Sequence, residues 1–219
     1  MDDYVPITPL DVKLFFIFLV VFLGGYYRTV LSPVAGRPDG FGNSSGISNL
    51  HSVPLCALAC LSLNQIIPES VPICWSVSFF VVDLLDCVVR REAMWFVHAV
   101  ISLTLNLLTG RSARHRALRS VSKGFFAEAS TPFLNHWKNS KSYPSYVVFF
   151  VVFTLCRVIW VPYFIYMTYA VHMNGEIDML IWPSLAFCVL QFVWYAKMCR
   201  IVVNYKLPKE VMEQSSKEQ

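Results

Sequence analysis

Charged residues are scarce in this sequence: Asp, Glu, Lys and Arg make up only 15% of the chain, whereas 56% is apolar. Soluble domains usually carry about 25% charged residues, so a soluble fold could not cover this much apolar surface. The net charge of +4 is small, and the basic residues lie between apolar runs. This pattern argues against nucleic acid as a partner and favours a protein that lies within lipid.

Metal-binding patterns are also missing. The seven cysteines include no CxxC pair, and no Cys/His spacing fits a zinc site. All of them lie inside or at the ends of apolar runs, so we interpret them as small apolar packing residues. Alternating, strand-like patterns are absent as well, which argues against a β-barrel. The sequence therefore predicts no metal site, requires no cofactor and favours an all-α fold.

Long apolar runs are what the sequence does contain. A helix needs about 20 apolar residues to cross a bilayer. Candidate segments lie at about 12–27, 50–67, 73–89, 93–108, 117–136, 143–172 and 179–205. Segment 117–136 is the least apolar, so we expect a multi-spanning transmembrane bundle of six or seven helices. Segment 143–172 is long enough to tilt, or to bend at Pro162.

The order of the segments predicts the organisation of the chain. Residues 1–43 would form a first, uncleaved transmembrane helix and a polar loop, since their acidic start does not resemble a secretory signal. Residues 44–207 would form the main transmembrane domain, and residues 208–219 a polar cytosolic tail.

The orientation of the chain has two alternatives. With seven spans the termini face opposite sides, and a cytosolic C-terminus places the basic stretch 111–123 in the lumen, against the positive-inside rule. With segment 117–136 re-entrant, both termini and the basic stretch are cytosolic. The sequon at Asn43 would be lumenal in the second arrangement and cytosolic in the first, unless it is a chance match.

Ionisable groups at membrane depth cost several kcal/mol unless they are paired or hydrated, and they therefore indicate candidate sites. Asp83 and Asp86 are three residues apart and share one helix face. Asp86 has an alternative role as the partner of Arg90, one turn later. His98 lies about as far beyond the charged turn as Asp83 lies before it, so the geometry allows an Asp83–His98 contact. His98 would then act as a general base, or else be a packed histidine.

Further polar groups occur in the other segments. His51 begins the second segment, either as a cavity residue or as a histidine at the membrane–water boundary. Glu128 and Asn135 lie on one segment with several hydroxyl residues, which indicates a helix face turned towards protein or water. Arg157 lies deep in the sixth segment and needs an acidic partner, for which Glu128 and Asp83 are the candidates.

Several stretches, in this order, resemble the TLC (TRAM/LAG/CLN homology) family. Glu128-Ala129-Ser130-Thr131-Pro132-Phe133-Leu134-Asn135 is similar to the family's E-x-S-T-P-F-x-N stretch and is the most specific match. The others are Ser48-Asn49-Leu50-His51-Ser52, the acidic residue Asp83, the Arg157–Tyr166 stretch and Gln191-Phe192-Val193-Trp194-Tyr195. Together they span about residues 44–207.

The resemblance implies a helical bundle around an internal cavity that is open to lipid. Ceramide synthases in this family use a His-His pair and a downstream Asp pair. Here His98 is followed by Ala99, and no Asp pair follows the basic stretch. The resemblance is therefore to the non-ceramide-synthase branch, which is implicated in membrane lipid composition and trafficking. It implies membrane lipids as partners, sphingolipid or acyl-CoA among them. It also implies a location in the endoplasmic reticulum or another endomembrane, with the plasma membrane as the alternative.

These observations support several functional hypotheses. The first is a protein of lipid homeostasis that binds, presents or regulates lipids or acyl chains. Its cavity residues at the lipid head would be His51, Asp86, Glu128, Asn135 and Arg157. The second is an acyltransferase that uses acyl-CoA as co-substrate, with His98 as general base and Asp83 orienting it. A transporter, a channel or a cargo receptor is a third class, although the paired repeats typical of transporters are missing.

Overall fold

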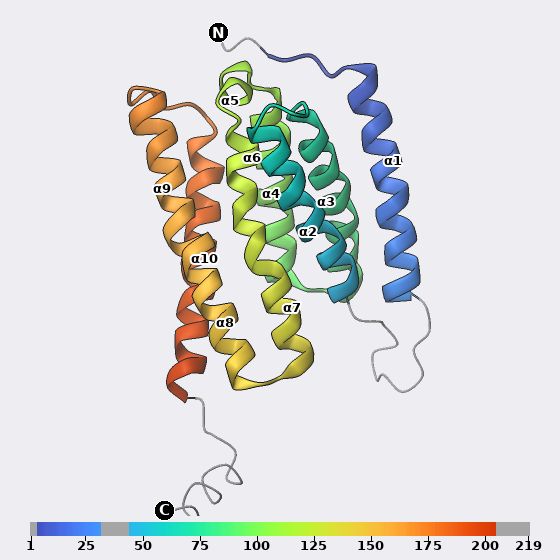
Figure 1. Cartoon of the computed structure of the whole chain (residues 1–219), viewed down its shortest axis with the longest axis vertical. Coiled ribbons are helices and arrows are strands. Elements are labelled where there is room, and N and C mark those ends of the chain that lie inside the picture. The colour runs from blue at the N-terminus through green and yellow to red at the C-terminus, as the bar shows by residue number, and fades with distance from the viewer. Residues whose placement is uncertain (1–3, 32–43, 205–219) are drawn as a thin grey trace, which may run out of the picture.

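The structure is a computed structural model that describes residues 4–31 and 44–204, so Asn43 and the tail at 208–219 lie outside the described residues. Within those ranges every regular element is helical, apart from an isolated bridge between Tyr4 and Ser112. The long helices run side by side in one bundle (Figure 1). The prediction of an all-α, multi-spanning bundle is confirmed.

The helices follow one another along the chain with short connections. The first part of the bundle contains α1 (Pro9–Tyr26), η1 (Tyr27–Leu31), α2 (Ser45–Leu63), α3 (Ser70–Arg90) and α4 (Ala93–Arg111). The middle part contains α5 (Ala113–Ala117), α6 (Ser120–Gly124), η2 (Phe125–Ser130) and α7 (Thr131–Ser140). The last part contains α8 (Tyr143–Phe153), η3 (Thr154–Ile159), α9 (Trp160–Tyr166), η4 (Met167–His172) and α10 (Ile181–Asn204).

Six stretches of the described chain are long and apolar enough to cross a membrane. They are Pro9–Leu31, Ser45–Leu63, Ser70–Arg90, Ala93–Arg111, Tyr143–His172 and Ile181–Val202. The run α6–η2–α7 adds a further crossing, because it passes from the α5 end of the bundle to the opposite end (Figure 1). The start of α1 and the end of α10 therefore lie at opposite ends of the bundle, as the seven-span alternative predicts, and the orientation of the chain in a membrane stays a prediction.

Helix α3 is the most enclosed of these helices, with α1, α2 and α4 packed around it. Its residues Phe79, Phe80 and Val82 form a core with Phe22 of α1 and Ala99 of α4. The opposite side of α1 exposes its apolar side chains, as a lipid-facing helix would. Burial of α3 matters for function because this helix carries Asp83 and Asp86 into the bundle.

The turn between α3 and α4 makes the two helices antiparallel neighbours. Arg91 adopts a left-handed conformation with φ of 58°. The N–H of Glu92 then bonds the carbonyl of Cys87 at 3.0 Å, which closes the end of α3 as in a Schellman motif. Because the turn is so short, Asp83 and His98 come to similar depths on facing helices.

The fifth predicted segment, 117–136, begins later than expected and is irregular. Arg119 has a φ of 50°, and the helical run starts only at Ser120. Pro132 has no N–H, so the carbonyl of Glu128 cannot accept an α-helical bond from it. The N–H of Thr131 bonds that carbonyl instead, in the tighter 3-10 turn η2. The interrupted helix explains why this crossing is absent from the apolar stretches above.

The long segment 143–172 is irregular before Pro162, where it contains a π-helical turn. The chain is π-helical over η3, Thr154–Ile159, and continues as the α-helix α9 that contains Pro162. Proline gives no N–H to the carbonyl of residue 158, which disturbs the preceding turn. The hydroxyl of Thr154 also donates to the carbonyl of Phe150 at 2.7 Å. The π turn contains Arg157, and π turns often occur at functional sites.

Candidate functional site

A cavity of about 310 Å³ lies among α2, α3, α4, η2, α7, α8, η3 and α10. We refer to it as the head-group cavity. Its wall contains every residue that the sequence analysis selected, namely His51, Asp83, Asp86, His98, Glu128, Asn135 and Arg157. These residues are up to 106 positions apart in the printed sequence, from His51 to Arg157. The bundle thus brings the predicted polar residues to one enclosed space.

A buried ion pair forms one side of the cavity. The guanidinium of Arg157 donates to Glu128 Oε1 at 3.1 Å, and both side chains are almost fully buried. Its remaining N–H groups donate to the carbonyl of Ala127 at 3.0 Å and to Gln191 Oε1 at 3.2 Å. The hydroxyl of Thr131 donates to Glu128 Oε2 at 2.8 Å. Full pairing allows these charges to lie inside an apolar bundle, and Glu128 is the partner expected for Arg157.

Asn135 connects α7 to α2 rather than projecting freely into the cavity. Its Nδ2 donates to Asn49 Oδ1 at 2.7 Å and to the carbonyl of Ser45 at 3.4 Å. Only 3% of Asn135 is exposed. The polar side of this segment therefore faces protein, as the sequence predicted, and it positions α7 beside the head-group cavity.

His51 is deeply buried between helices, as the cavity alternative predicts, and its depth in the membrane stays a prediction. Its ring stacks on Phe79 with 3.9 Å between centroids, and only 1% of the residue is exposed. Helix α2 begins at Ser45, about five residues before the predicted start of this segment. His51 therefore lies within the helix and not at its end, and its side chain points into the bundle. Nε2 of His51 is buried without a hydrogen-bond partner.

His98, on α4, is surrounded by aromatic rings from α3 and α10. The rings of Phe80, Phe187 and Trp194 lie with centroids 5.9, 5.8 and 5.1 Å from its own. Its Nδ1 is buried and has no hydrogen-bond partner within residues 4–31 and 44–204. The contact that the spacing allows between Asp83 and His98 is absent from the hydrogen bonds of the described residues. Both side chains line the same cavity, but similar depth on neighbouring helices did not bring them into contact.

The two aspartates of α3 differ in their surroundings. Asp86 accepts from Arg90 Nε at 2.7 Å and from the hydroxyl of Tyr26 at 2.8 Å, so the predicted pairing with Arg90 is found. Tyr26 belongs to α1 and was not selected from the sequence, because one tyrosine in an apolar run carries no local signal. Asp83 has no hydrogen bond or ion pair within residues 4–31 and 44–204, and its side chain lines the cavity.

The cavity reaches the molecular surface at the end of the bundle opposite α5. The exposed lining residues there are Glu92, Lys138 and Lys197. Nζ of Lys138 lies 5.1 Å from the ring centroid of Trp95, which also lines the cavity. Tryptophan and lysine commonly gather at the level of lipid head groups. Their place at the cavity mouth depends on tertiary packing, which the sequence does not show.

The chemistry of the cavity favours binding of a polar group beside an apolar one. Nε2 of His51 and Nδ1 of His98 have no partners in the described chain and lie beside aromatic rings, and Asp83 lines the same cavity. No group of three or more His, Cys, Asp or Glu side chains in residues 4–31 and 44–204 could hold a metal ion. A small cavity with a few convergent polar groups and apolar walls is typical of a site for an amphipathic ligand.

Comparison with protein families gives one match. The family model TRAM/LAG1/CLN8, described as TLC domain, matches residues 12–200. This match includes most of helix α1 and extends to the last turns of α10. No curated protein and no solved structure matches the chain in the corresponding comparisons.

Proposed function

Because the chain belongs to the TRAM/LAG1/CLN8 (TLC domain) family and is an integral membrane protein, we propose that it binds a membrane lipid by its polar head. The head group lies in the head-group cavity, and the acyl chains extend along the apolar helices. The family is linked to lipid biology, and the binding of lipid would serve lipid homeostasis in an internal membrane. The endoplasmic reticulum is the proposed location.

One observation carries this proposal: the head-group cavity holds two buried ring nitrogens, His51 Nε2 and His98 Nδ1, that nothing in the described protein satisfies, and Asp83 lines the same space. A buried polar group without a partner costs about 1–3 kcal/mol. Asp83 accepts hydrogen bonds, and each neutral imidazole offers one donor and one acceptor. A lipid head that carries an ammonium or hydroxyl group supplies matching partners. Lys138 and Lys197 at the mouth are placed to meet a phosphate or carboxylate of the same lipid.

Native mass spectrometry of the full-length protein, released from nanodiscs of defined lipids, tests the proposal. Wild type is expected to retain one lipid under conditions that strip the lipids bound to its surface. Asp83→Leu removes the unpaired carboxylate and should reduce the retained lipid severalfold. Glu176→Gln, a change at a residue with a side chain that is 70% exposed and remote from the cavity, is the control. Equal retention by Asp83→Leu and wild type would contradict the proposal.

An acyltransferase is the second candidate, and the free Nδ1 of His98 favours it. In that reaction His98 takes a proton from an acceptor amine or hydroxyl, while the acceptor forms a bond to the thioester carbonyl of acyl-CoA. The thiolate of coenzyme A leaves and receives the proton. The missing Asp83–His98 bond removes the orienting carboxylate, so the geometry favours binding. An acyl-transfer assay on membranes that compares wild type with His98→Ala distinguishes the two, since only catalysis requires product to fall.

A further inference from the structure

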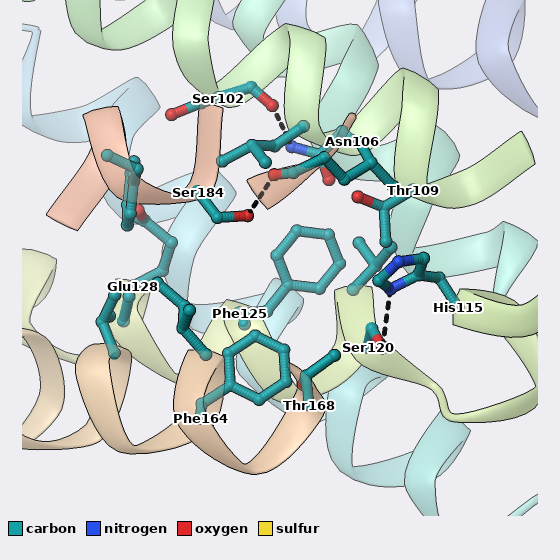
Figure 2. A pocket seen from close by; sticks show the side chains of 18 of the residues that line it. Ser102, Asn106, Thr109, His115, Ser120, Phe125, Glu128, Phe164, Thr168 and Ser184 are labelled. Atoms are coloured by element: carbon teal, nitrogen blue, oxygen red, sulfur yellow. Dashed lines mark hydrogen bonds between the residues drawn. The ribbon is translucent and has the colours of Figure 1, made fainter. Parts of the chain in front are cut away.

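A second cavity lies between α4, α6, α9 and α10, close to the α5 end of the bundle (Figure 2). Its volume is about 110 Å³. Phe80 and Glu128 line both this cavity and the head-group cavity, so the two spaces meet at these residues. We refer to the second space as the vestibule. It does not contain His51, Asp83 or Arg157, and the inference below does not depend on lipid binding.

Polar side chains of α4 face the vestibule on successive turns. Ser102, Asn106 and Thr109 all line it, and they continue the helix face that carries His98. Nδ2 of Asn106 donates to the carbonyl of Ser102 at 2.7 Å (Figure 2). Ser102 Oγ and Asn106 Oδ1 are buried and have no hydrogen-bond partner among the residues that the structure describes. Ser102 is 5% exposed and Asn106 is 6% exposed, so bulk solvent does not satisfy them.

The occupant of the vestibule must therefore supply hydrogen bonds. An acyl chain cannot form hydrogen bonds. An empty cavity would leave Ser102 Oγ and Asn106 Oδ1 unsatisfied, at a cost of about 1–3 kcal/mol each. Buried water bonds to two to four polar groups and occupies about 30 Å³ per molecule in the liquid. The vestibule, at about 110 Å³, therefore has room for roughly three to four water molecules. Thr168 and Ser184 add hydroxyl groups to its other walls (Figure 2).

Water in this position would also lower the free-energy cost of burying the Glu128–Arg157 ion pair. Glu128 forms the inner boundary of the vestibule, and its partner Arg157 lies immediately behind it. Charged groups at membrane depth are far less costly when they border a water-filled space than when they border lipid. The vestibule therefore gives a physical reason why Glu128 and Arg157 are tolerated within apolar helices.

At the α5 end of the bundle, the boundary of the vestibule is formed by His115, which is hydrogen-bonded to Asp178. Nε2 of His115 lies 2.8 Å from Asp178 Oδ2, and Nδ1 lies 3.3 Å from Ser120 Oγ. The side chain of His115 is 4% exposed, whereas that of Asp178 is 17% exposed. The hydroxyl of Tyr169 donates to Asp178 at 2.9 Å. The other charged groups near this boundary are Arg114 and Glu176, which pair with each other.

From these contacts we infer that the vestibule is a water-filled space that hydrates Glu128 from the α5 end of the bundle. The His115–Asp178 pair controls the exchange of its water with solution. Asp178 belongs to the connector between η4 and α10, so movement of this connector opens the boundary without unfolding a long helix.

Radiolytic hydroxyl-radical footprinting of the full-length protein in nanodiscs tests for the water. Radicals form from water inside the cavity, so Phe125 and Phe164 of its wall should be oxidised severalfold faster than Phe22. Phe22 is 0% exposed and borders neither cavity. Asn106→Leu should reduce the oxidation of Phe125, whereas the same change at the exposed Asn64 should not. Oxidation of Phe125 and Phe164 no faster than that of Phe22 would mean a dry or lipid-filled space and would overturn the inference.

Transfer of the protein into water labelled with oxygen-18 tests the boundary. The time course with which label enters the oxidation products at Phe125 reports how fast the internal water exchanges. Asp178→Asn keeps an oxygen for Tyr169 but loses the acceptor for His115, and should accelerate exchange severalfold. His115→Ala should accelerate it further, and Glu176→Gln on the same connector should match wild type. Unchanged exchange in Asp178→Asn, shown to be folded by its thermal unfolding, would refute control by this pair.

Discussion

Replacement of Arg157 by methionine tests the packing of the bundle around its buried charges. Methionine fills similar volume but leaves Glu128 as a buried carboxylate with no cation beside it. Removing one partner of a buried pair typically destabilises a protein by about 3–5 kcal/mol. The expected effect lies at the upper end, because Arg157 also donates to Ser130 Oγ at 2.8 Å and to Gln191. For a chain of this size, that corresponds to a fall of roughly 6–20 °C in the unfolding temperature.

Thermal unfolding in nanodiscs, followed by tryptophan fluorescence, measures this change. Glu128→Gln and the double variant complete a double-mutant cycle, in which the double variant should lose less stability than the sum of the single changes. Arg200→Met replaces an exposed arginine of α10 and should unfold like wild type. The reasoning is refuted if Arg157→Met also unfolds like wild type, or if the two single changes are additive.

Other changes test individual contacts. Tyr26→Phe removes the bond to Asp86 and should cost about 1–3 kcal/mol in thermal unfolding, whereas Tyr27→Phe, at a position 70% exposed, should cost nothing measurable. His51→Phe removes a ring nitrogen without a partner, so stability in the same assay should not fall, but the lipid retained in native mass spectrometry should. Burial raises the pKa of Glu69 above its ordinary value, so its contribution to stability is present below the ordinary pKa and is lost as pH rises through the raised one. Unfolding temperatures measured from pH 4 to 8 should therefore decline less in Glu69→Gln; an identical decline would show that Glu69 is not responsible.

Much of the fold could be predicted because membrane helices have a strong local signal. Continuous apolar runs predicted the crossings, and the short charged turn at Arg90–Glu92 predicted that α3 and α4 are antiparallel. The crossing at 120–140 was the hardest to define, since its polar face is buried against protein rather than exposed to lipid. Buried Ser130, Thr131 and Asn135 lower its apolarity in the sequence, although they are satisfied in the bundle.

The candidate site was predicted as a set of residues but not as a set of contacts. Glu128 and Arg157 were identified because a charged side chain at membrane depth costs free energy unless it is paired. The same rule predicted that the two bond to each other. The position of His98 relative to Asp83 depends on the rotation of α4 about its axis, which spacing from a turn does not determine. The vestibule was missed because Ser102 and Asn106 are uncharged and do not stand out in an apolar helix. His115 and Asp178 are 63 residues apart in the sequence, and only the folded bundle brings them together.

The position of a bound lipid head group tests the central claim most directly. A lipid with a photoreactive diazirine on its head group, incorporated into nanodiscs with the full-length protein, can be cross-linked and its attachment sites mapped by mass spectrometry. The account predicts labelling of head-group cavity residues such as Trp95, Thr131 and Trp194. Labelling confined to lipid-facing residues such as Val20 and Tyr166, which are 69% and 62% exposed, would contradict it.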